Sequence, residues 1–489
     1  MPSELSMRIV GVSHDDVERG GSSASGTNAN APSGPLLESA SRDAPKRQRP
    51  HSHNYSGPTP RAVKAFLVAS IVTLLALITT AATSGKMEAL RASLAANNEG
   101  DGGRVVMDGS APRRDCMLTQ DAWNKATGLD RHDPCRDVSA RGGGVRDAFE
   151  SLGIENADDA WALVTGGAGF IGSEIVRQLL DVGVRVRVLD NLSTGSPEKL
   201  AFTASAQKQG TYEFVKGDVK EFADVSKAMR GVRFVFHLAA ISKVRPTLDV
   251  SRGDIVAECV EENVRGTENV LRATRVRDAE LASQSASAEE RKRRRVRFVY
   301  AGSSTYYGNQ PTPFDEEQTH LRTTTSPYAT TKAQGEDLAR LYYAMYGVDA
   351  VVNRLFMVYG PGEPTAEDQA VVTGRFFAAA QKGEPLVIEG DGLQFRDFVH
   401  VEDAARGMIL SAFADGAAGR TINIGSGKST TILELAKSVS SKHTFVAARE
   451  PDLKGTLAST CLAKRVLGFE AKVSLAEYVA TTKREKGIA

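Results

Sequence analysis

The chain has 489 residues, with 61 Lys and Arg against 60 Asp and Glu, so its formal net charge at pH 7 is only +1. This balance gives no reason to expect a nucleic-acid-binding protein, and the length allows two or three domains. The cysteines show no C-x-x-C spacing, so we expect no metal site and no thioredoxin-like redox site; they are Cys116, Cys135, Cys259 and Cys461. Cys116 and Cys135 lie in a polar segment, where they either pair in an oxidising compartment or stay free thiols.

The N-terminal part of the chain is first polar and then strongly apolar. Residues 1–64 are rich in Ser, Gly, Asn, Pro and Arg, and such a segment cannot bury enough surface to offset its ordering entropy. We therefore predict that it is disordered. Residues 65–85 carry no charge, and about 21 residues at about 1.5 Å each span a bilayer core. We predict one transmembrane helix here; a buried core helix is the alternative, but the polar flanks offer nothing to bury it against.

The charges beside residues 65–85 predict the orientation of this helix. Several Lys and Arg residues precede it, whereas Lys86 and Arg91 follow it with Glu88 between them. By the positive-inside rule the N-terminus lies in the cytoplasm and the rest of the chain in a lumen. A single-pass anchor of this kind indicates the secretory pathway, and we favour the Golgi. A plastid or mitochondrial presequence is the alternative, but the early acidic residues and the long apolar run argue against it.

Residues 86–158 are rich in Gly, Asp and Arg without sustained periodicity, so we expect a stem or linker with a short helix near residues 119–127. From residue 159 on, apolar runs of strand length alternate with helical stretches. This alternation predicts an α/β fold in which a doubly wound parallel sheet carries helices on both faces. The expected strands are Ala160–Thr165, Val184–Leu189, Tyr212–Val215, Phe234–Leu238, Arg297–Ala301 and Ala350–Leu355.

Residues 276–295 interrupt the alternation at a place where a short connection is usual. The segment is polar and ends in a run of Arg and Lys. We interpret it as a solvated surface insertion, and a basic docking patch is the alternative.

Three glycines directly follow the first expected strand. Thr165 ends the strand, and Gly166, Gly169 and Gly172 lead into the helical stretch Ser173–Leu180. Glycines in this pattern allow a tight turn and close approach of a pyrophosphate, while the helix N-terminus supplies N–H groups and partial positive charge. A strand before and a helix after are the context that the motif requires. The sequence therefore predicts a dinucleotide-binding site.

Residues at the ends of the following strands fit the same site. Asp190 ends the second strand at the spacing expected of a carboxylate that binds the adenosine ribose hydroxyls, and it would repel a 2′-phosphate. We therefore predict NAD rather than NADP, with a simple turn residue as the alternative. Asp218 closes the third strand, and we expect it beside the adenine. His237 closes the fourth strand, and we interpret it as a structural histidine rather than a catalyst.

Tyr328 and Lys332 are the candidates for proton transfer. They are four residues apart on an expected helix, so they share one face. A lysine ammonium in that position can lower the pKa of a tyrosine from about 10 toward neutrality. A tyrosinate beside a nicotinamide can take a proton from a hydroxyl while hydride leaves its carbon.

In their order along residues 160–485, these motifs resemble the extended short-chain dehydrogenase/reductase family, and within it the nucleotide-sugar epimerases and dehydratases. The resemblance implies a Rossmann domain at residues 159–356, with 398–425 returning to it, and a smaller C-terminal substrate domain at 357–489. It implies NAD and a UDP-sugar bound between them, and we also expect a homodimer. The matching stretches are Val164–Gly172, Leu189–Leu192, Gly217–Val219, His237–Ala240, Asn263–Thr267, Gly302–Gly308, Ser326–Lys332, Arg354–Pro361, Gly390–Asp397 and Asn423–Gly427.

The resemblance also implies roles for single residues. Tyr328 would be the base, Lys332 would bind the nicotinamide ribose, and Ser303 would hydrogen-bond the reacting sugar oxygen. The residues expected to contact NAD are Gly166, Gly169, Phe170, Ile171, Gly172, Asp190, Asn191, Asp218, Val219, Leu238, Ala239, Ala240, Tyr328, Lys332 and Phe356. Those expected to contact the sugar nucleotide are Ser303, Thr305, Asn263, Met357, Arg396, Arg449 and Thr456.

Within the second set, Asn263 matches a residue near the substrate and a catalytic water. Arg396 and Arg449 match arginines that clamp the diphosphate, and guanidinium forks suit phosphate oxygens. A surface ion pair with Asp397 is the alternative for Arg396, and Arg449 is the weaker match.

The segment Ser303-Ser304-Thr305 bears on the reaction. The sugar 4,6-dehydratases of the family carry an Asp–Glu pair in this segment, and the UDP-glucuronate decarboxylases carry Glu at its third position, where this chain has Thr305. Hydroxyls without a carboxylate still permit oxidation at C4, rotation of the ketone and return of hydride to its other face. The departure favours a UDP-sugar 4-epimerase. A decarboxylase or dehydratase with its carboxylate elsewhere is the alternative, and a non-catalytic NAD-binding protein is less favoured because Tyr328 and Lys332 are both present.

Met357 and Thr456 leave the identity of the sugar open. Met357 stands where many UDP-galactose 4-epimerases have an asparagine, and methionine donates no strong hydrogen bond. Thr456 matches a position at which a bulky residue excludes N-acetyl groups in some epimerases. UDP-glucose with UDP-galactose, the N-acetylated pair, UDP-glucuronate and UDP-xylose all remain candidates.

Overall fold

The computed structural model describes residues 144–152, 160–242, 247–248, 251, 253–321, 326–365, 370–448 and 453–488. The predictions of a disordered segment at 1–64 and a membrane helix at 65–85 lie outside these ranges, as do Cys116, Cys135 and most of the predicted linker. Among the helices that are described, none combines the length and the apolar character needed to cross a membrane.

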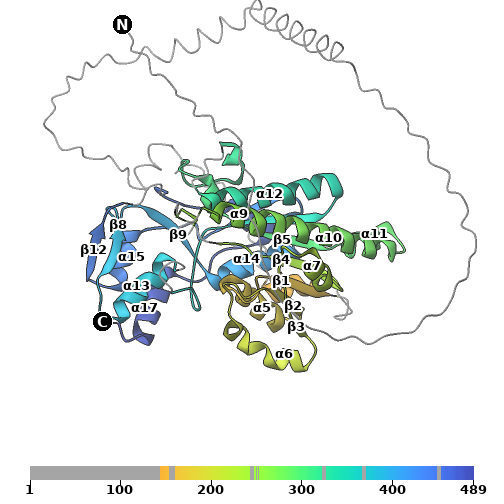
Figure 1. Cartoon of the computed structure of the whole chain (residues 1–489), viewed down its shortest axis with the longest axis horizontal. Coiled ribbons are helices and arrows are strands. Elements are labelled where there is room, and N and C mark those ends of the chain that lie inside the picture. Colours follow the sequence, from red (N-terminus) through yellow and green to blue (C-terminus); the bar gives the residue numbers. More distant parts are fainter. Residues whose placement is uncertain are drawn as a thin grey trace, which may run out of the picture. The chain divides into compact units, whose positions relative to one another are not determined.

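A parallel sheet of seven strands forms the centre of the described structure, in the order β3-β2-β1-β4-β5-β6-β10 (Figure 1). Every strand expected from the sequence is present within a few residues, which confirms the prediction of a Rossmann-like α/β fold. Only the last strand was not among those expected. The strands are β1 Trp161–Thr165, β2 Arg185–Asp190, β3 Tyr212–Lys216, β4 Val232–His237, β5 Arg297–Ser303, β6 Asp349–Leu355 and β10 Thr421–Ile424.

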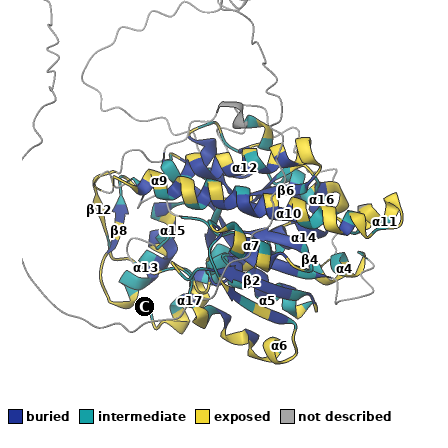
Figure 2. Cartoon of the chain, turned by 45° about the vertical axis from the view of Figure 1, so that its right-hand side comes forward, coloured by how far each residue is buried: buried dark blue, intermediate teal, exposed yellow. Residues whose placement is uncertain are grey.

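Helices cover both faces of this sheet, which explains why its strands read as continuous apolar runs. On one face α5 (Phe170–Asp181) and α14 (Val401–Phe413) pack on β1 and β5. On the other face lie α7 (Phe222–Ala228), α10 (Gly266–Ser283) and α12 (Pro327–Tyr346). Figure 2 shows the strands as buried, whereas α6 (Ala204–Lys208) is largely exposed.

Helix α12 has well-defined ends, which fix the position of the two residues proposed for proton transfer. The Ser326 side chain accepts a hydrogen bond from the Ala329 N–H at 3.1 Å, and Pro327 occupies the first turn. Both features favour a helix start. Gly347 ends the helix with φ 69°, a left-handed conformation that glycine adopts at little cost.

Outside the seven-stranded sheet, smaller sheets and helices form a second lobe with its own aromatic-rich core (Figure 1). Strand order reverses between β2-β1 and β4 in the large sheet, and such a point opens a crevice at the carboxyl ends of the strands. The second lobe lies beside that crevice. Its elements are β7 Met357–Tyr359, β8 Leu386–Glu389, β9 Phe395–His400, β11 Ser429–Thr431, β12 His443–Val446, α13 Val372–Gln381, α15 Ile432–Val439 and α17 Leu475–Glu485.

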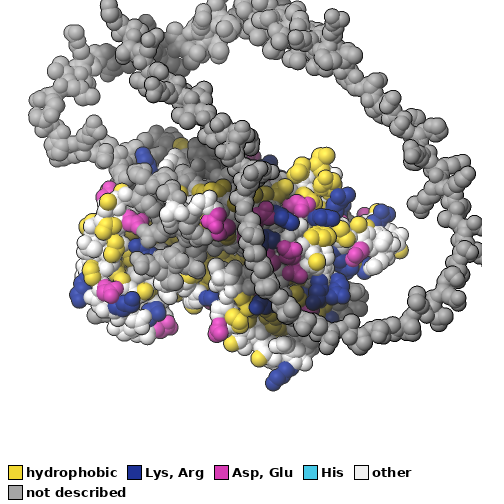
Figure 3. All heavy atoms as spheres, in the orientation of Figure 1, with side chains coloured by type: hydrophobic (Ala, Val, Ile, Leu, Met, Phe, Trp, Pro, Cys, Tyr) yellow, Lys and Arg dark blue, Asp and Glu magenta, His cyan; other side chains and the backbone are white. Residues whose placement is uncertain are grey.

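Helices occur both in the predicted linker and in the insertion at 276–295. Helix α4 (Val145–Glu150), in the predicted linker, places Phe149 against Phe413 with ring centroids 5.5 Å apart. The insertion at 276–295 consists of the end of α10 and the short helix α11 (Ala288–Arg293). On the face shown in Figure 3, Lys and Arg side chains lie among Asp and Glu side chains rather than as one continuous basic area. The remaining helical segments are η3 Pro197–Thr203, α9 Ile255–Cys259, η4 Val260–Arg265, η5 Ser304–Tyr307, η6 Glu316–Leu321, η7 Asp415–Ala417 and α16 Cys461–Leu467.

Candidate active site

A cleft of about 480 Å³ lies between the carboxyl ends of the sheet strands and the second lobe. Most residues predicted to bind NAD or the sugar nucleotide line it. They are Gly166, Gly169, Phe170, Ile171, Gly172, Asp190, Asn191, Val219, Leu238, Ala239, Ala240, Ser303, Thr305, Tyr328, Lys332, Phe356, Met357, Arg396 and Thr456. The fold therefore brings together residues from distant parts of the sequence. Arg449 lies outside the described ranges.

The glycine loop has the shape that a dinucleotide pyrophosphate needs. Gly166 has φ 70°, and a Cβ atom on it would lie 2.8 Å from the Ala239 nitrogen. A Cβ atom on Gly172 would lie 2.2 Å from the Gly166 carbonyl oxygen. Side chains at these two positions would disrupt the close approach of β1, α5 and the segment after β4. The loop thus leads the backbone into the N-terminus of α5 at Phe170, where free N–H groups favour an anion.

Asp190 both shapes the turn after β2 and lies in the cleft wall. Its carboxylate accepts hydrogen bonds from the Ala168 N–H at 2.9 Å and the Leu192 N–H at 2.8 Å. Leu192 adopts φ 63°, which the bond to Asp190 stabilises. Asp190 can therefore stabilise the turn and also bind a ribose, because its carboxylate can accept further hydrogen bonds.

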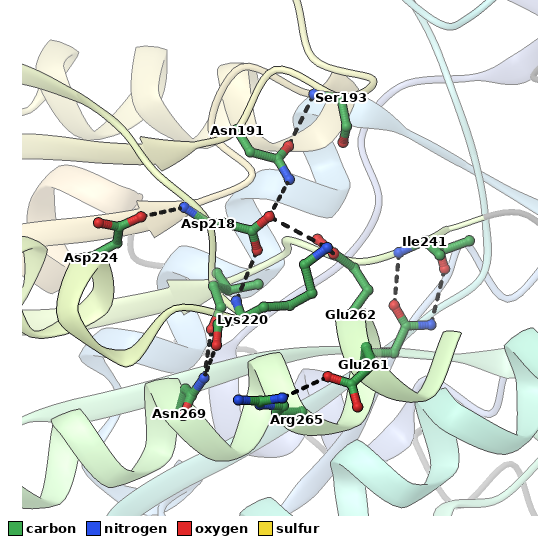
Figure 4. A network of polar contacts seen from close by, with 12 residues as sticks. Asn191, Ser193, Asp218, Lys220, Asp224, Ile241, Glu261, Glu262, Arg265 and Asn269 are labelled. Atoms are coloured by element: carbon green, nitrogen blue, oxygen red, sulfur yellow. Dashed lines mark hydrogen bonds and ion pairs between the residues drawn. The ribbon is translucent and has the colours of Figure 1, made fainter. Parts of the chain in front are cut away.

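Asp218, expected beside the adenine, lies between the cleft-lining residues Gly217 and Val219, and its side chain is 24% exposed. Its carboxylate accepts hydrogen bonds from Asn191 Nδ2 at 3.1 Å and from the Lys220 N–H at 2.8 Å (Figure 4). The carboxylate that faces the cleft there belongs to Glu262, which lies on η4 and whose Oε2 is 3.2 Å from Lys220 Nζ. No spacing rule distinguishes Glu262 from the exposed Glu261, so the sequence alone does not single it out.

Asn263, which matches a residue near the substrate, is buried beside the cleft. It is 1% exposed and lies behind the cleft wall rather than in it. Its Oδ1 accepts a hydrogen bond from the Ile241 N–H at 2.7 Å, and its Nδ2 donates to Thr331 Oγ1 at 2.9 Å. Asn263 therefore connects the segment after β4 to α12. Its hydrogen bonds are made to the protein on both sides.

His237 is a buried structural histidine, as its position suggested. Its Nδ1 lies 2.7 Å from Thr165 Oγ1 and its Nε2 lies 2.9 Å from Thr267 Oγ1. Burial and the nearby Lys332 lower the pKa of His237 to about 3, so the ring is neutral at pH 7. A neutral ring held on both sides fixes the end of β4.

The electrostatics of Tyr328 and Lys332 differ from the sequence-based expectation. Burial lowers the pKa of Lys332 to about 7, and its Nζ lies 4.3 Å from the centre of the Tyr300 ring. Burial raises the pKa of Tyr328, while its hydrogen bond to Ser303 acts in the opposite direction. Burial decides the direction of both pKa shifts, because removing both groups from water disfavours the charged form of each.

Ser303, which hydrogen-bonds Tyr328, belongs to a short run of hydroxyl side chains. Ser303 Oγ lies 2.9 Å from Thr305 Oγ1 and accepts a hydrogen bond from the Thr305 N–H at 3.2 Å. Ser303, Ser304 and Thr305 all line the cleft. The carboxylates that line the described cleft are Asp190, Glu262 and Glu389, and none of them belongs to this segment.

Arg396 and Thr456 lie on the side of the cleft formed by the second lobe. Arg396 is 8% exposed and its Nη1 donates to the Phe395 carbonyl oxygen at 2.9 Å. Thr456 is 3% exposed and accepts a hydrogen bond from the Asp397 N–H at 3.4 Å. The neighbouring Asp397 carboxylate accepts hydrogen bonds from the N–H groups of Ser426, Gly427 and Ala458, which holds this wall together.

The chain is similar to known NAD-dependent enzymes that act on sugar nucleotides. The model of the NAD-dependent epimerase/dehydratase family matches residues 162–425. A UDP-glucuronate 4-epimerase of Thermodesulfobacterium geofontis is 32% identical over 327 residues, covering 64% of this chain and 92% of its own length. A dTDP-glucose 4,6-dehydratase of Streptomyces griseus is 33% identical over 333 residues, covering 65% and 92%. The crystal structure of a UDP-glucuronic acid 4-epimerase from Bacillus cereus with UDP-glucuronic acid and NAD has a TM-score of 0.57 and 27% identity, covering 67% of this chain and 99% of that chain.

Proposed function

The chain belongs to the NAD-dependent epimerase/dehydratase family, and from this premise we propose that it inverts C4 of a UDP-sugar through a transient 4-keto sugar. NAD is the cofactor, and when bound it supplies the acceptor and later the donor of one hydride. The glycine loop, Asp190 and the N-terminus of α5 would hold it. Arg396 would hold the diphosphate of the substrate on the opposite side of the cleft.

Tyr328 would take the proton from the 4-hydroxyl and later return it. Because burial raises the pKa of Tyr328, the phenolate needs stabilisation from its surroundings, and Ser303 supplies one hydrogen bond. Lys332 adds a positive charge only while it is protonated, and burial lowers its pKa to about 7. Tyr328 is therefore neutral before the reaction, and Lys332 is partly protonated near neutral pH.

The observation that carries the choice of reaction is the hydroxyl cluster of Ser303, Ser304 and Thr305 in the cleft that also contains Tyr328. Elimination of water requires a further acid and base beside the sugar, and these hydroxyls do not provide a carboxylate for that purpose. Epimerisation needs only the redox step, the base and space for the keto sugar to turn. A 4,6-dehydratase or a decarboxylase is the runner-up, since dehydratases are among the relatives of similar identity.

The test is to incubate the purified chain with UDP-glucose, UDP-N-acetylglucosamine, UDP-glucuronate and UDP-xylose and to identify the products by NMR. We expect a C4 epimer without loss of water or carbon dioxide, and no net accumulation of NADH. Tyr328→Phe should reduce turnover by several orders of magnitude while NAD binding persists, because it removes one oxygen and little contact area. A 4-keto-6-deoxy sugar or a decarboxylated product would refute the epimerase assignment.

We further propose that residues 65–85 anchor the enzyme in a membrane of the secretory pathway, with the catalytic domain lumenal and the Golgi as the favoured site. The uncharged run and its basic N-terminal flank support this. The homodimer stays a prediction. Sedimentation of the full chain can measure its oligomeric state.

A further inference from the structure

The ammonium group of Lys332 lies over the face of a buried aromatic ring. Lys332 Nζ is 4.3 Å from the centre of the Tyr300 ring, and the two residues are only 4% and 0% exposed. Burial raises the pKa of Tyr300, so this ring is a neutral phenol. The face of such a ring carries partial negative charge and attracts a cation, most strongly where water is excluded. The contact therefore favours the protonated form of the lysine over the neutral amine.

The backbone of α12 holds the ring in this position. Tyr300 lies on β5, three residues before Ser303, and its hydroxyl donates a hydrogen bond to the Lys332 carbonyl oxygen at 3.1 Å. Helix and ring approach closely, since a Cβ atom on Gly335 would lie 2.1 Å from the Tyr300 hydroxyl oxygen. One end of the ring is thus fixed to the helix that carries the lysine, which keeps the face of the ring under the ammonium.

Other titratable groups near Lys332 come from α12, β4 and β6. Tyr328 and Glu336 lie one turn away on either side of it, and Arg354 binds the Glu336 carboxylate at 2.6 Å. His237, at the end of β4, is neutral because burial and Lys332 lower its pKa to about 3. Burial also lowers the pKa of Lys332, to about 7, because the ammonium has lost the water that favours its charge. Any group that replaces part of this stabilisation raises the pKa of the lysine again.

The proposed reaction needs the protonated form of Lys332. Its positive charge would stabilise the phenolate of Tyr328, whose own pKa is raised by burial. A lysine with a pKa of about 7 carries that charge only part of the time at neutral pH. A ring that binds the ammonium but not the amine acts against burial and increases the protonated fraction.

We propose that Tyr300 is a positioning residue for the reaction, whose ring face keeps Lys332 protonated and in place and so extends activity to higher pH. This role rests on the proposed function, in which Lys332 assists Tyr328. A contact between a ring and a desolvated ammonium changes the protonation equilibrium by about 10-fold, or about one pH unit. Tyr300 is 0% exposed, so it acts through the lysine rather than by touching the substrate.

The first experiment measures the contact without any substrate. Chemical denaturation of the full chain gives the unfolding constants of wild type, Tyr300→Leu, Lys332→Met and the double variant at pH 6 and pH 9.5. We expect the two substitutions to be coupled by about 10-fold at pH 6, where the folded lysine is charged, and by a factor near one at pH 9.5, where it is neutral. If Tyr300→Leu does not fold, Tyr300→Met, which has a non-aromatic side chain of similar length, takes its place.

Phe298→Leu is the matched control for this cycle. Phe298 lies two residues earlier on the same face of β5 and is 0% exposed. Its ring centroid is 5.9 Å from that of His237, the same distance as for Tyr300. Coupling of Phe298→Leu to Lys332→Met should therefore show no dependence on pH. Coupling of Tyr300→Leu that is equal at both pH values would overturn the proposal, because the ring would then only pack against the lysine stem.

The second experiment measures kcat/KM against pH with the UDP-sugar of the panel above that wild type epimerises. Activity should fall as pH rises through the pKa of Lys332, and Tyr300→Leu should move this fall down by about one pH unit. Tyr300→Phe keeps the ring and should leave the fall within a few tenths of a unit of wild type. An unchanged profile in Tyr300→Leu would refute the role of Tyr300 in the reaction. Failure of wild type to epimerise any sugar would refute the proposed function, whereas the denaturation cycle still decides whether the ring binds the ammonium.

Discussion

Glu336 and Arg354 form a two-point ion pair inside the molecule. Arg354 Nη2 lies 2.6 Å from Glu336 Oε1, and Arg354 Nε lies 3.1 Å from Glu336 Oε2. Neither side chain is more than 1% exposed. Glu336 follows Lys332 by one turn of α12, so the pair joins the helix that carries the proposed base to the strand that leads into Phe356.

Two tyrosines after the hydroxyl cluster connect to this pair. Tyr306 Oη donates to Glu336 Oε2, and Arg354 Nη1 donates to Tyr307 Oη at 2.7 Å. Both rings are fully buried. The network therefore fixes Ser303–Thr305 relative to Tyr328 without touching the cleft, and its buried charges are costly unless every partner is present.

Tyr306→Phe should lower kcat by about 10-fold with little change in KM, because a small displacement of the hydroxyl cluster weakens proton transfer more than substrate binding. Tyr342→Phe is the matched control: Tyr342 lies on α12, toward the opposite end of the helix from Tyr328, and its Oη donates to Glu268 Oε1 at 2.9 Å. Each variant should lose about 1–3 kcal/mol of unfolding free energy. Steady-state kinetics and chemical denaturation measure both quantities, and an equal loss of kcat in the two variants would contradict the positioning role of Tyr306.

Lys332→Met should stabilise the protein while abolishing activity. Burial lowers the pKa of Lys332 to about 7, so the unfolded chain binds more protons than the folded chain between there and the ordinary lysine pKa of about 10.4. The stability of wild type therefore rises with pH across this window, and the full penalty is present below it. We expect the variant to gain about 2–4 kcal/mol at pH 6.5 and to lose this gain as pH approaches 10. Denaturation at several pH values, with the exposed Lys208→Met as control, is the measurement; a gain independent of pH would contradict the explanation.

Thr456→Tyr should change which sugar is turned over. Thr456 lines the cleft beside Arg396 and is small, so a tyrosine ring would fill space in which an acetamido group could lie. A misfit of this kind costs about 1–3 kcal/mol, or roughly 10- to 200-fold in specificity. We expect kcat/KM to fall more for N-acetylated UDP-sugars than for UDP-glucose. Thr456→Ser and the melting temperature of each variant are the controls, and an unchanged ratio would show that Thr456 lies away from the sugar.

A tag after Ala489 should be protected from protease in intact vesicles. The uncharged residues 65–85 and the basic residues before them predict a lumenal C-terminus. Protection should disappear on addition of detergent, and a tag before Met1 should be digested in both conditions. Digestion of the C-terminal tag without detergent would reverse the proposed orientation.

The Rossmann-like sheet and the place of the glycine loop can be predicted from the sequence alone. Strands buried on both faces must be continuously apolar, and this property is visible in runs such as Trp161–Thr165 and Arg297–Ser303. Gly166 and Gly172 can also be recognised in the sequence, because a Cβ atom at either position would clash with the backbone and only glycine fits there. The Tyr328–Lys332 spacing also survives into the structure, because helical periodicity fixes which side chains share a face.

Which polar side chains line the cleft, and how far each is protonated, depends on the tertiary structure and could not be predicted from the sequence. Asp218 and Asn263 accept hydrogen bonds from Asn191 and Ile241, and Glu262, which no spacing predicted, lines the cleft. Burial, rather than spacing, sets the pKa of Lys332 to about 7 and raises that of Tyr328. The physical reason is that hydrogen-bond partners and desolvation depend on segments distant in the chain, such as α12 against β5 and η4 beside Lys220, whereas strand and helix formation depends on neighbouring residues.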